Sequence, residues 1–195
     1  AQHDEVGGVT GEPTGGDGLL GRERLVGDAL GYRETARLRV RIDRTHAACI
    51  LVDDRTEVAD GPAFRIADAV IYEAHVRDFS VDKSAGAGHP GSFLALAEKG
   101  THVPGDPDTA TGLDHLRELG VNTLQLMPIH AFDAPDPSKP HNWGYMTLHF
   151  NAPEPTYASD GAGATAVREL KETISSLHRA HLKVVMDVVY NHSTE

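Results

Sequence analysis

Three apolar runs stand out in the C-terminal two thirds of the chain. They cover residues 69–76, 121–129 and 182–189, and the last run is nearly continuous and rich in valine. Apolar runs of this length, bounded by turn residues, are typical of strands that are buried on both faces, as in parallel sheets. The pattern therefore predicts three parallel strands in this part of the chain.

Helical patterns separate the three runs. Residues 111–120 place leucines at helical spacing, with Thr111 as a candidate N-cap, Asp114 at the capping-box position and Gly120 as a stop signal. Residues 164–180 repeat the helical spacing. Their apolar stripe consists of Val167, Leu170, Ile174 and Leu177. The alternation of strand and helix predicts a parallel β/α architecture.

The N-terminal third has a different character. Residues 1–18 are rich in glycine, proline, threonine and acidic residues without periodicity, which is typical of a disordered tail or linker. Residues 35–43 alternate apolar side chains with arginines, and residues 48–53 are apolar up to a final aspartate, so both are predicted strands. The arginine row reads either as an anion site or as the solvated face of an antiparallel strand. Residues 19–66 are too few to bury much core alone, so we interpret them as the end of a small β-domain.

The connections between the predicted elements are of unequal length. The helix-to-strand connections are short, whereas the strand-to-helix connections, residues 77–110 and 128–162, are long. Long loops in compact domains are usually functional. In a β/α barrel, the loops that follow the strands build the active site. We therefore expect a site made from these two loops and the residues after 189.

Composition and charge exclude several classes of function. The 195 residues carry a formal net charge of −11, which disfavours nucleic acid or an anionic membrane as a partner. No run approaches the roughly 18 apolar residues of a membrane span. Cys49 is the single cysteine, so neither an internal disulfide nor a cysteine-based zinc site can form. The N-terminus has no signal-peptide pattern, and the sequence leaves cytoplasmic and secreted locations open.

Two groups of residues carry candidate chemistry. Asp187 lies in the third apolar run, and Asn191 and His192 follow at the predicted strand end. An acid in an apolar strand needs a partner, so Asp187 is either a site residue or a buried structural acid. The segment Asn142–Tyr145 combines an amide, the only tryptophan and a tyrosine. Aromatic faces beside polar groups suit the stacking of sugar rings, and they also suit ordinary packing within a loop.

Four segments, in order and spacing, resemble one enzyme family. They are VIYEAHVRDFS (70–80), GLDHLRELGVN (112–122), NWGY (142–145) and MDVVYNHST (186–194). Together they are similar to the first part of the catalytic domain of type I pullulanase, in the α-amylase superfamily of glycoside hydrolases. The VVYNH segment is specific for the superfamily. The segments at residues 70–80 and 142–145 narrow the resemblance to the pullulanase and isoamylase branch of that superfamily.

The resemblance implies an α/β fold. Residues 67–195 would form the first three strands of an incomplete (β/α)8 TIM barrel, and residues 19–66 would be the remnant of a β-sandwich module that precedes it. A partner chain or further C-terminal sequence would complete the barrel.

The resemblance also assigns roles to individual residues. Tyr145 would stack on the sugar before the scissile bond, and His192 would hydrogen-bond the primary hydroxyl of that sugar. Asp187 would anchor an arginine near the nucleophile. Asn142 and Trp143 would shape the loop that carries Tyr145.

One further residue concerns metal binding. In calcium-dependent members of the family, the position of Asn191 supplies a ligand to the ion. No other cofactor is implied by the resemblance.

The implied activity is hydrolysis, with retention of configuration, of α-1,6 branch linkages in α-glucans such as pullulan, starch or glycogen. The family uses two carboxylates about 5–5.5 Å apart. The resemblance places both beyond Glu195, so no catalytic residue is assigned here and the isolated chain is expected to be inactive. The alternatives are an isoamylase-like or α-amylase-like hydrolase, a non-catalytic glucan-binding protein, or a truncated product without function.

Some positions depart from the family pattern. His141, Met146 and Thr147 replace residues of a segment that usually reads Tyr-Asn-Trp-Gly-Tyr-Asp-Pro. The second predicted helix is followed by Ala180 and His181, where the family usually has a glycine. These differences indicate a diverged or degraded member of the family.

Overall fold

A computed structural model describes residues 52, 54–133 and 142–192, all of which lie in one compact unit, Val52–Glu195. The tail predicted over residues 1–18 and the strand predicted over residues 35–43 lie outside the described residues. The same is true of residues 48–53 except Val52, which is in no strand.

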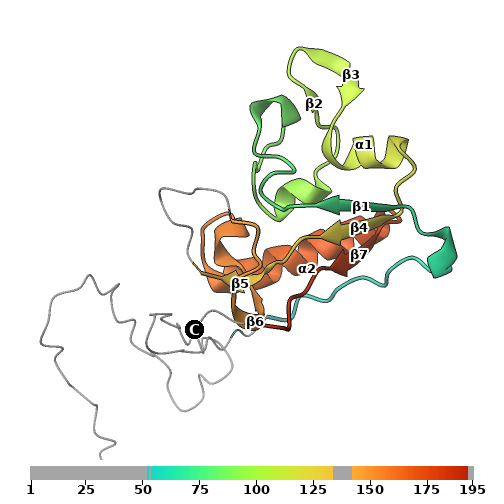
Figure 1. Ribbon diagram of the computed structural model, residues 1–195. Coiled ribbons are helices and arrows are strands. Elements are labelled where there is room, and N and C mark those ends of the chain that lie inside the picture. Colours follow the sequence, from blue (N-terminus) through green and yellow to red (C-terminus); the bar gives the residue numbers. More distant parts are fainter. Residues whose placement is uncertain (1–51, 53, 134–141, 193–195) are drawn as a thin grey trace, which may run out of the picture. The chain divides into compact units, whose positions relative to one another are not determined.

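The centre of this unit is a parallel sheet of three strands. Its strands are β1 (Ile71–Ala74), β4 (Thr123–Leu126) and β7 (Lys183–Met186), in that spatial order. Figure 1 shows them side by side, with helix α2 running along the sheet. The three predicted strands and their parallel arrangement are thus confirmed.

Each strand is shorter than the apolar run that predicted it. In the second run, the amide of Met127 still donates to the carbonyl of Ala74, at 3.0 Å. The next residue is Pro128, which has no N–H to continue the ladder. Strand β4 therefore ends at Leu126, in the middle of the apolar run.

Two α-helices connect the strands of the sheet. Helix α1 (Gly112–Glu118) precedes β4, and helix α2 (Gly163–Arg179) precedes β7. Both predicted helices are confirmed within one or two residues of their expected ends. Gly120 has a φ of 76°, so it takes the left-handed conformation that commonly ends a helix.

The predicted capping box of α1 is wrong. Thr111 occupies the N-cap position, but its side chain makes no capping bond to the helix. Its hydroxyl instead donates to the carbonyl of Ala85, at 2.6 Å. The Asp114 carboxylate accepts from the amide of Gly100, at 2.5 Å. Both side chains therefore bind the preceding loop in place of the helix terminus.

The hydrophobic core lies between one face of the sheet and the two helices. Leu124 and Leu126 of the central strand are fully buried, as are Leu113 and Leu116 of α1 and Leu177 of α2. The strands are not buried on both faces as predicted, except for β4. Residues 71–73 of β1 and residues 185–186 of β7 are exposed, because these strands form the two edges of the sheet and the described helices cover one face.

The buried face of α2 also differs from the predicted apolar stripe. Of the four stripe residues, only Leu177 is buried. Buried polar residues occupy much of the face, and each has a partner in an adjacent loop. The Thr173 hydroxyl donates to the carbonyl of Phe93, and the Glu169 carboxylate accepts from the amide of Ser159, both at 3.0 Å.

Both long loops contain secondary structure that the sequence pattern did not predict. The first loop holds an antiparallel pair, β2 (His102–Val103) and β3 (Asp106–Ala110). The second holds another, β5 (His130–Phe132) and β6 (Thr147–Pro153), beyond the end of β4. Short 3-10 helices complete the unit: η2 (Ile66–Asp68), η3 (Lys83–Ala85), η4 (Leu94–Ala97) and η5 (Pro155–Tyr157).

Within the part of the chain that the structure describes, no helix combines the length and the apolar character that crossing a membrane requires.

Candidate functional site

Asp187 is held at the C-terminal edge of the sheet, directly after β7. Its amide donates to the carbonyl of Leu126 at 2.8 Å, which continues the pairing of β4 with β7 by one residue. The side chain is half-buried. The backbone pairing therefore fixes the position of the Asp187 main chain at the C-terminal edge of the parallel sheet. Active sites of such folds are built at this edge.

Tyr145 and His192 meet Asp187 at this edge. Tyr145 lies in the loop before β6, and its hydroxyl donates to the Asp187 carboxylate at 2.8 Å. Nε2 of His192 lies 2.9 Å from the carbonyl oxygen of Tyr145, so this ring nitrogen is the donor. The structure thus brings together the three residues that the sequence analysis selected, from two loops that are distant along the chain.

The segment Asn142–Tyr145 forms a tight turn before β6. The side-chain oxygen of Asn142 accepts from the amide of Gly144 at 2.9 Å, and its side-chain nitrogen donates to the carbonyl of Asp133 at 3.1 Å. Asn142 therefore links the backbone at Gly144 to the backbone at Asp133. Trp143, between them, is 57% exposed.

Gly144 is required by the course of this turn. Its φ is 85°, a backbone angle that residues other than glycine rarely adopt. A Cβ atom at this position would lie 2.5 Å from the carbonyl oxygen of Pro128. The turn therefore passes so close to the chain after β4 that any side chain at this position would force the backbone to shift.

The electrostatics of the site hold the proton on Tyr145. The hydrogen bond to Asp187 raises the pKa of Tyr145 from 10.0 to about 12, with smaller contributions from burial and from the charges of Asp187 and Glu73. Glu73 lies on β1, where its carboxylate accepts from the side-chain amide of Gln125 at 2.7 Å. At neutral pH, Tyr145 is therefore a hydrogen-bond donor to Asp187 and not an anion.

We expect alkaline pH to release this contact. Because folding raises the pKa of Tyr145, its contribution to stability is complete below about pH 10 and is lost as the pH rises through about 12. Titration of phenolate absorbance in the native chain and in Tyr145→Phe gives the Tyr145 curve by difference. A Tyr145 phenol that titrates at its ordinary value would contradict the bond to Asp187.

Asn191 is the one residue for which the resemblance implies calcium binding. Calcium takes about six to eight oxygen ligands. Asn191 is exposed after β7, and within residues 52, 54–133 and 142–192 no three His, Cys, Asp or Glu side chains gather as a metal-binding group. The ligand role that the resemblance implies for Asn191 remains a prediction, as do the arginine partner of Asp187 and the sugar contact of His192.

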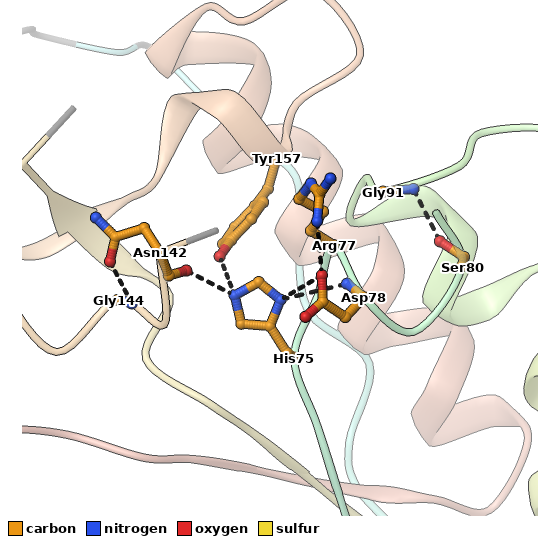
Figure 2. Close-up of polar contacts among 8 residues, drawn as sticks. All are labelled: His75, Arg77, Asp78, Ser80, Gly91, Asn142, Gly144 and Tyr157. Carbon is orange, nitrogen blue, oxygen red and sulfur yellow. Dashed lines mark hydrogen bonds and ion pairs between the residues drawn. The ribbon is translucent and has the colours of Figure 1, made fainter. Parts of the chain in front are cut away.

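His75 and Tyr157 are two buried residues near this site that the sequence analysis missed. The side chain of His75, directly after β1, is 6% exposed, and its Nε2 contacts both the carbonyl of Asn142 and the hydroxyl of Tyr157 (Figure 2). A signal for His75 was present, because it is a polar residue near the end of the apolar run 69–76 and within the family segment 70–80. No sequence pattern indicated Tyr157.

Comparison with known proteins identifies the family. The family model described as "Alpha amylase, catalytic domain" matches residues 89–195, more than half of the chain. The chain belongs to this family. Alpha-amylase catalytic domains have a TIM-barrel-type fold, and the three parallel strands with their connecting helices follow that plan.

Relatives within the alpha-amylase family include debranching enzymes. The chain is 44% identical to a pullulanase of Bacillus subtilis (strain 168), over 64% of this chain and 18% of that protein. It is 38% identical to the chloroplastic isoamylase SU1 of Zea mays, over 66% of this chain and 16% of that protein. The chain thus spans less than a fifth of the length of these two relatives.

Solved structures that resemble this chain include pullulanases as well. The crystal structure of pullulanase type I from Bacillus subtilis str. 168, complexed with maltose, matches 82% of this chain and 23% of that chain. The TM-score is 0.70 and the identity is 37%. The resemblance to type I pullulanases within the alpha-amylase family is therefore confirmed.

Proposed function

We propose that this chain contributes part of the glucan-binding site of a pullulanase-type hydrolase that cleaves α-1,6 linkages in α-glucans. The observation that carries the proposal is the convergence of Tyr145, Asp187 and His192 at the C-terminal edge of the sheet. The similarity to pullulanase, isoamylase and glycogen debranching enzyme supports the linkage, and the related pullulanase structures in complex with maltotriose and maltose support the substrate class.

The geometry suits a stacking platform for a sugar. The hydrogen bond to Asp187 fixes the outer end of the Tyr145 ring, and the Asn142 turn fixes its backbone. A ring held at both ends loses little further entropy when a sugar stacks on it, which favours binding. Asp187 adds a carboxylate beside the ring, and carboxylates accept hydrogen bonds from sugar hydroxyls.

The same proposal extends to the organisation of the chain. Residues 67–195 would be the first part of the (β/α)8 barrel, residues 19–66 the remnant of a β-sandwich module, and residues 1–18 a tail or linker. Additional sequence, on this or another chain, would pair with β1 and β7, the outer strands of the sheet within the described residues.

Binding of matched oligosaccharides tests the proposal. Trp143 is the only tryptophan and lies within the Asn142–Tyr145 turn, so its fluorescence reports on this site. We expect maltohexaose to change Trp143 fluorescence with a saturable dependence, and the β-1,4-linked hexasaccharide of equal length to have no such effect. Equal responses to both sugars, or no response to either, would contradict a glucan site at Tyr145.

Hydrolysis of pullulan by the same chain is tested separately from binding. Release of reducing ends from pullulan by the 195-residue chain is expected to stay at the level of a boiled control, because no pair of catalytic carboxylates is assigned to it. Release that grows with protein concentration would show that an acid pair within this sequence had been missed.

A further inference from the structure

The backbone that carries His75 is fixed independently of the glucan site. The carbonyl of His75 accepts from the amide of Phe79 at 2.9 Å, which closes a turn directly after β1. Ser80 at the end of this turn is buried, and its hydroxyl oxygen accepts from the amide of Gly91 at 2.8 Å (Figure 2). The imidazole therefore projects from a rigid segment.

The hydrogen-bond pattern defines the tautomer of the His75 ring. The amide of Asp78 lies 3.2 Å from Nδ1, and because an amide can only donate, Nδ1 is an acceptor. The Asp78 carboxylate lies 3.7 Å from the same nitrogen, which is beyond hydrogen-bond distance. The ring proton of the neutral imidazole therefore resides on Nε2. From there it points at the carbonyl oxygen of Asn142, 2.9 Å away and 67 residues along the chain.

Tyr157 sets the position of this ring from the other side. Its hydroxyl lies 3.1 Å from Nε2, and its ring makes an edge contact with the imidazole at a centroid distance of 5.9 Å. Phe93 and Phe132 pack edge-on against Tyr157 at 5.5 and 5.8 Å. Burial, with the charge of Glu154, raises the pKa of Tyr157, so its hydroxyl stays neutral. Contacts within the core thus hold Nε2 of His75 in position toward the Asn142 carbonyl.

The carbonyl that His75 binds belongs to the residue that shapes the turn. The backbone of Asn142 is held by His75, and its side chain is bonded to Gly144 and Asp133. Tyr145 follows Gly144 directly and reaches Asp187. A continuous series of hydrogen bonds and backbone therefore runs from His75 to the Tyr145 hydroxyl.

We propose that His75 is a positioning residue: its Nε2–H bond to the Asn142 carbonyl fixes the Asn142–Tyr145 turn and thereby places Tyr145 against Asp187. His75 does not itself reach the Tyr145–Asp187 contact. The effect on the turn stands on the contacts above, and the consequence for glucan affinity rests on the proposed function.

The wild-type chain offers a direct test by NMR of the His75 ring. The long-range nitrogen–proton correlation pattern is expected to show a protonated Nε2 and an unprotonated Nδ1, with a coupling across the hydrogen bond to the Asn142 carbonyl. A ring protonated on Nδ1, or a freely exchanging Nε2 proton, would overturn the proposal without any substitution.

Two substitutions separate the two nitrogens of His75. A glutamine amide reaches about as far as Nε2, so His75→Gln keeps a donor for Asn142. An asparagine amide reaches only as far as Nδ1, so His75→Asn keeps an acceptor for the Asp78 amide but loses the bond to Asn142. Both variants remove the ring, which makes each the control for the other.

We expect His75→Asn to increase acrylamide quenching of Trp143 and to weaken maltohexaose binding about tenfold, with His75→Gln close to wild type in both. Two folded variants with equal quenching would overturn the positioning role. If quenching separates them but no form, wild type included, binds maltohexaose, the proposed function fails and the positioning role stands. The sugar-free measurements thus test His75 independently of the substrate.

Discussion

Gly144→Ala is expected to lower the free energy of unfolding by about 2–5 kcal/mol, through backbone strain and overpacking together. The φ of 85° is unfavourable for alanine, and the added methyl would lie 2.5 Å from the carbonyl oxygen of Pro128. Backbone must move to relieve that contact, and the turn it moves carries Tyr145. The loss is measured by urea unfolding of the chain, and it is large beside a total stability of about 5–15 kcal/mol.

Gly105 is the matched control for Gly144. It lies in the β2–β3 hairpin with a φ of 87°, and a Cβ atom there would meet nothing within 4 Å. Gly105→Ala therefore carries the backbone strain alone, about 1–2 kcal/mol. The difference between the two variants isolates the clash with Pro128. Equal losses would mean that the turn moves aside at no cost and is not constrained by the chain after β4.

The convergence of Tyr145, Asp187 and His192 was predictable, because two kinds of sequence information agree there. A parallel β/α pattern places the residues after each strand at one edge of the sheet, which selects the region after β7. The Asn142–Tyr145 segment was selected by its composition and by its resemblance to a family motif. Neither the β/α pattern nor the family motif depends on the exact ends of the strands. The early end of β4 at Leu126 therefore did not affect the predicted convergence.

The contacts that support the site could not be predicted in the same way. The bond from His75 to Asn142 joins a side chain to a backbone carbonyl 67 residues away, and backbone carbonyls are identical at every position. The β5–β6 pair was missed for a related reason. Its strands are joined across a long connection, without a tight-turn signal between two alternating runs.

Helix α2 shows how periodicity can mislead about burial. Apolar spacing selects the side chains that avoid water, but Glu169 and Thr173 are buried because loops supply their hydrogen-bond partners. The end of the same helix is a clearer case. The absence of the usual glycine was visible in the sequence, and His181 takes that place with a φ of 65°. The helix therefore ends in the left-handed conformation although the glycine that favours this conformation is absent.

Tyr145→Ala is expected to weaken maltohexaose binding by about ten- to a hundredfold. Covering an aromatic face is worth about 1.5–3 kcal/mol, and alanine removes the whole face. Tyr145→Phe keeps the ring and loses the hydroxyl that donates to Asp187. We therefore expect Phe to retain most of the affinity and to lose about 1 kcal/mol of stability. Calorimetric titration and urea unfolding of the three forms give both quantities.

The two substitutions also distinguish stacking from support. If Tyr145 acted only by holding Asp187 in place, Tyr145→Phe and Tyr145→Ala would weaken binding equally, and the stacking role would be wrong. A double-mutant cycle of Tyr145→Phe with Asp187→Ala measures their bond directly. Because the hydroxyl and the carboxylate contact each other at 2.8 Å, the double variant should lose about 0.5–1.5 kcal/mol less than the sum of the two single losses. Strict additivity would mean that Tyr145 and Asp187 act independently and that their 2.8 Å contact does not stabilise the fold.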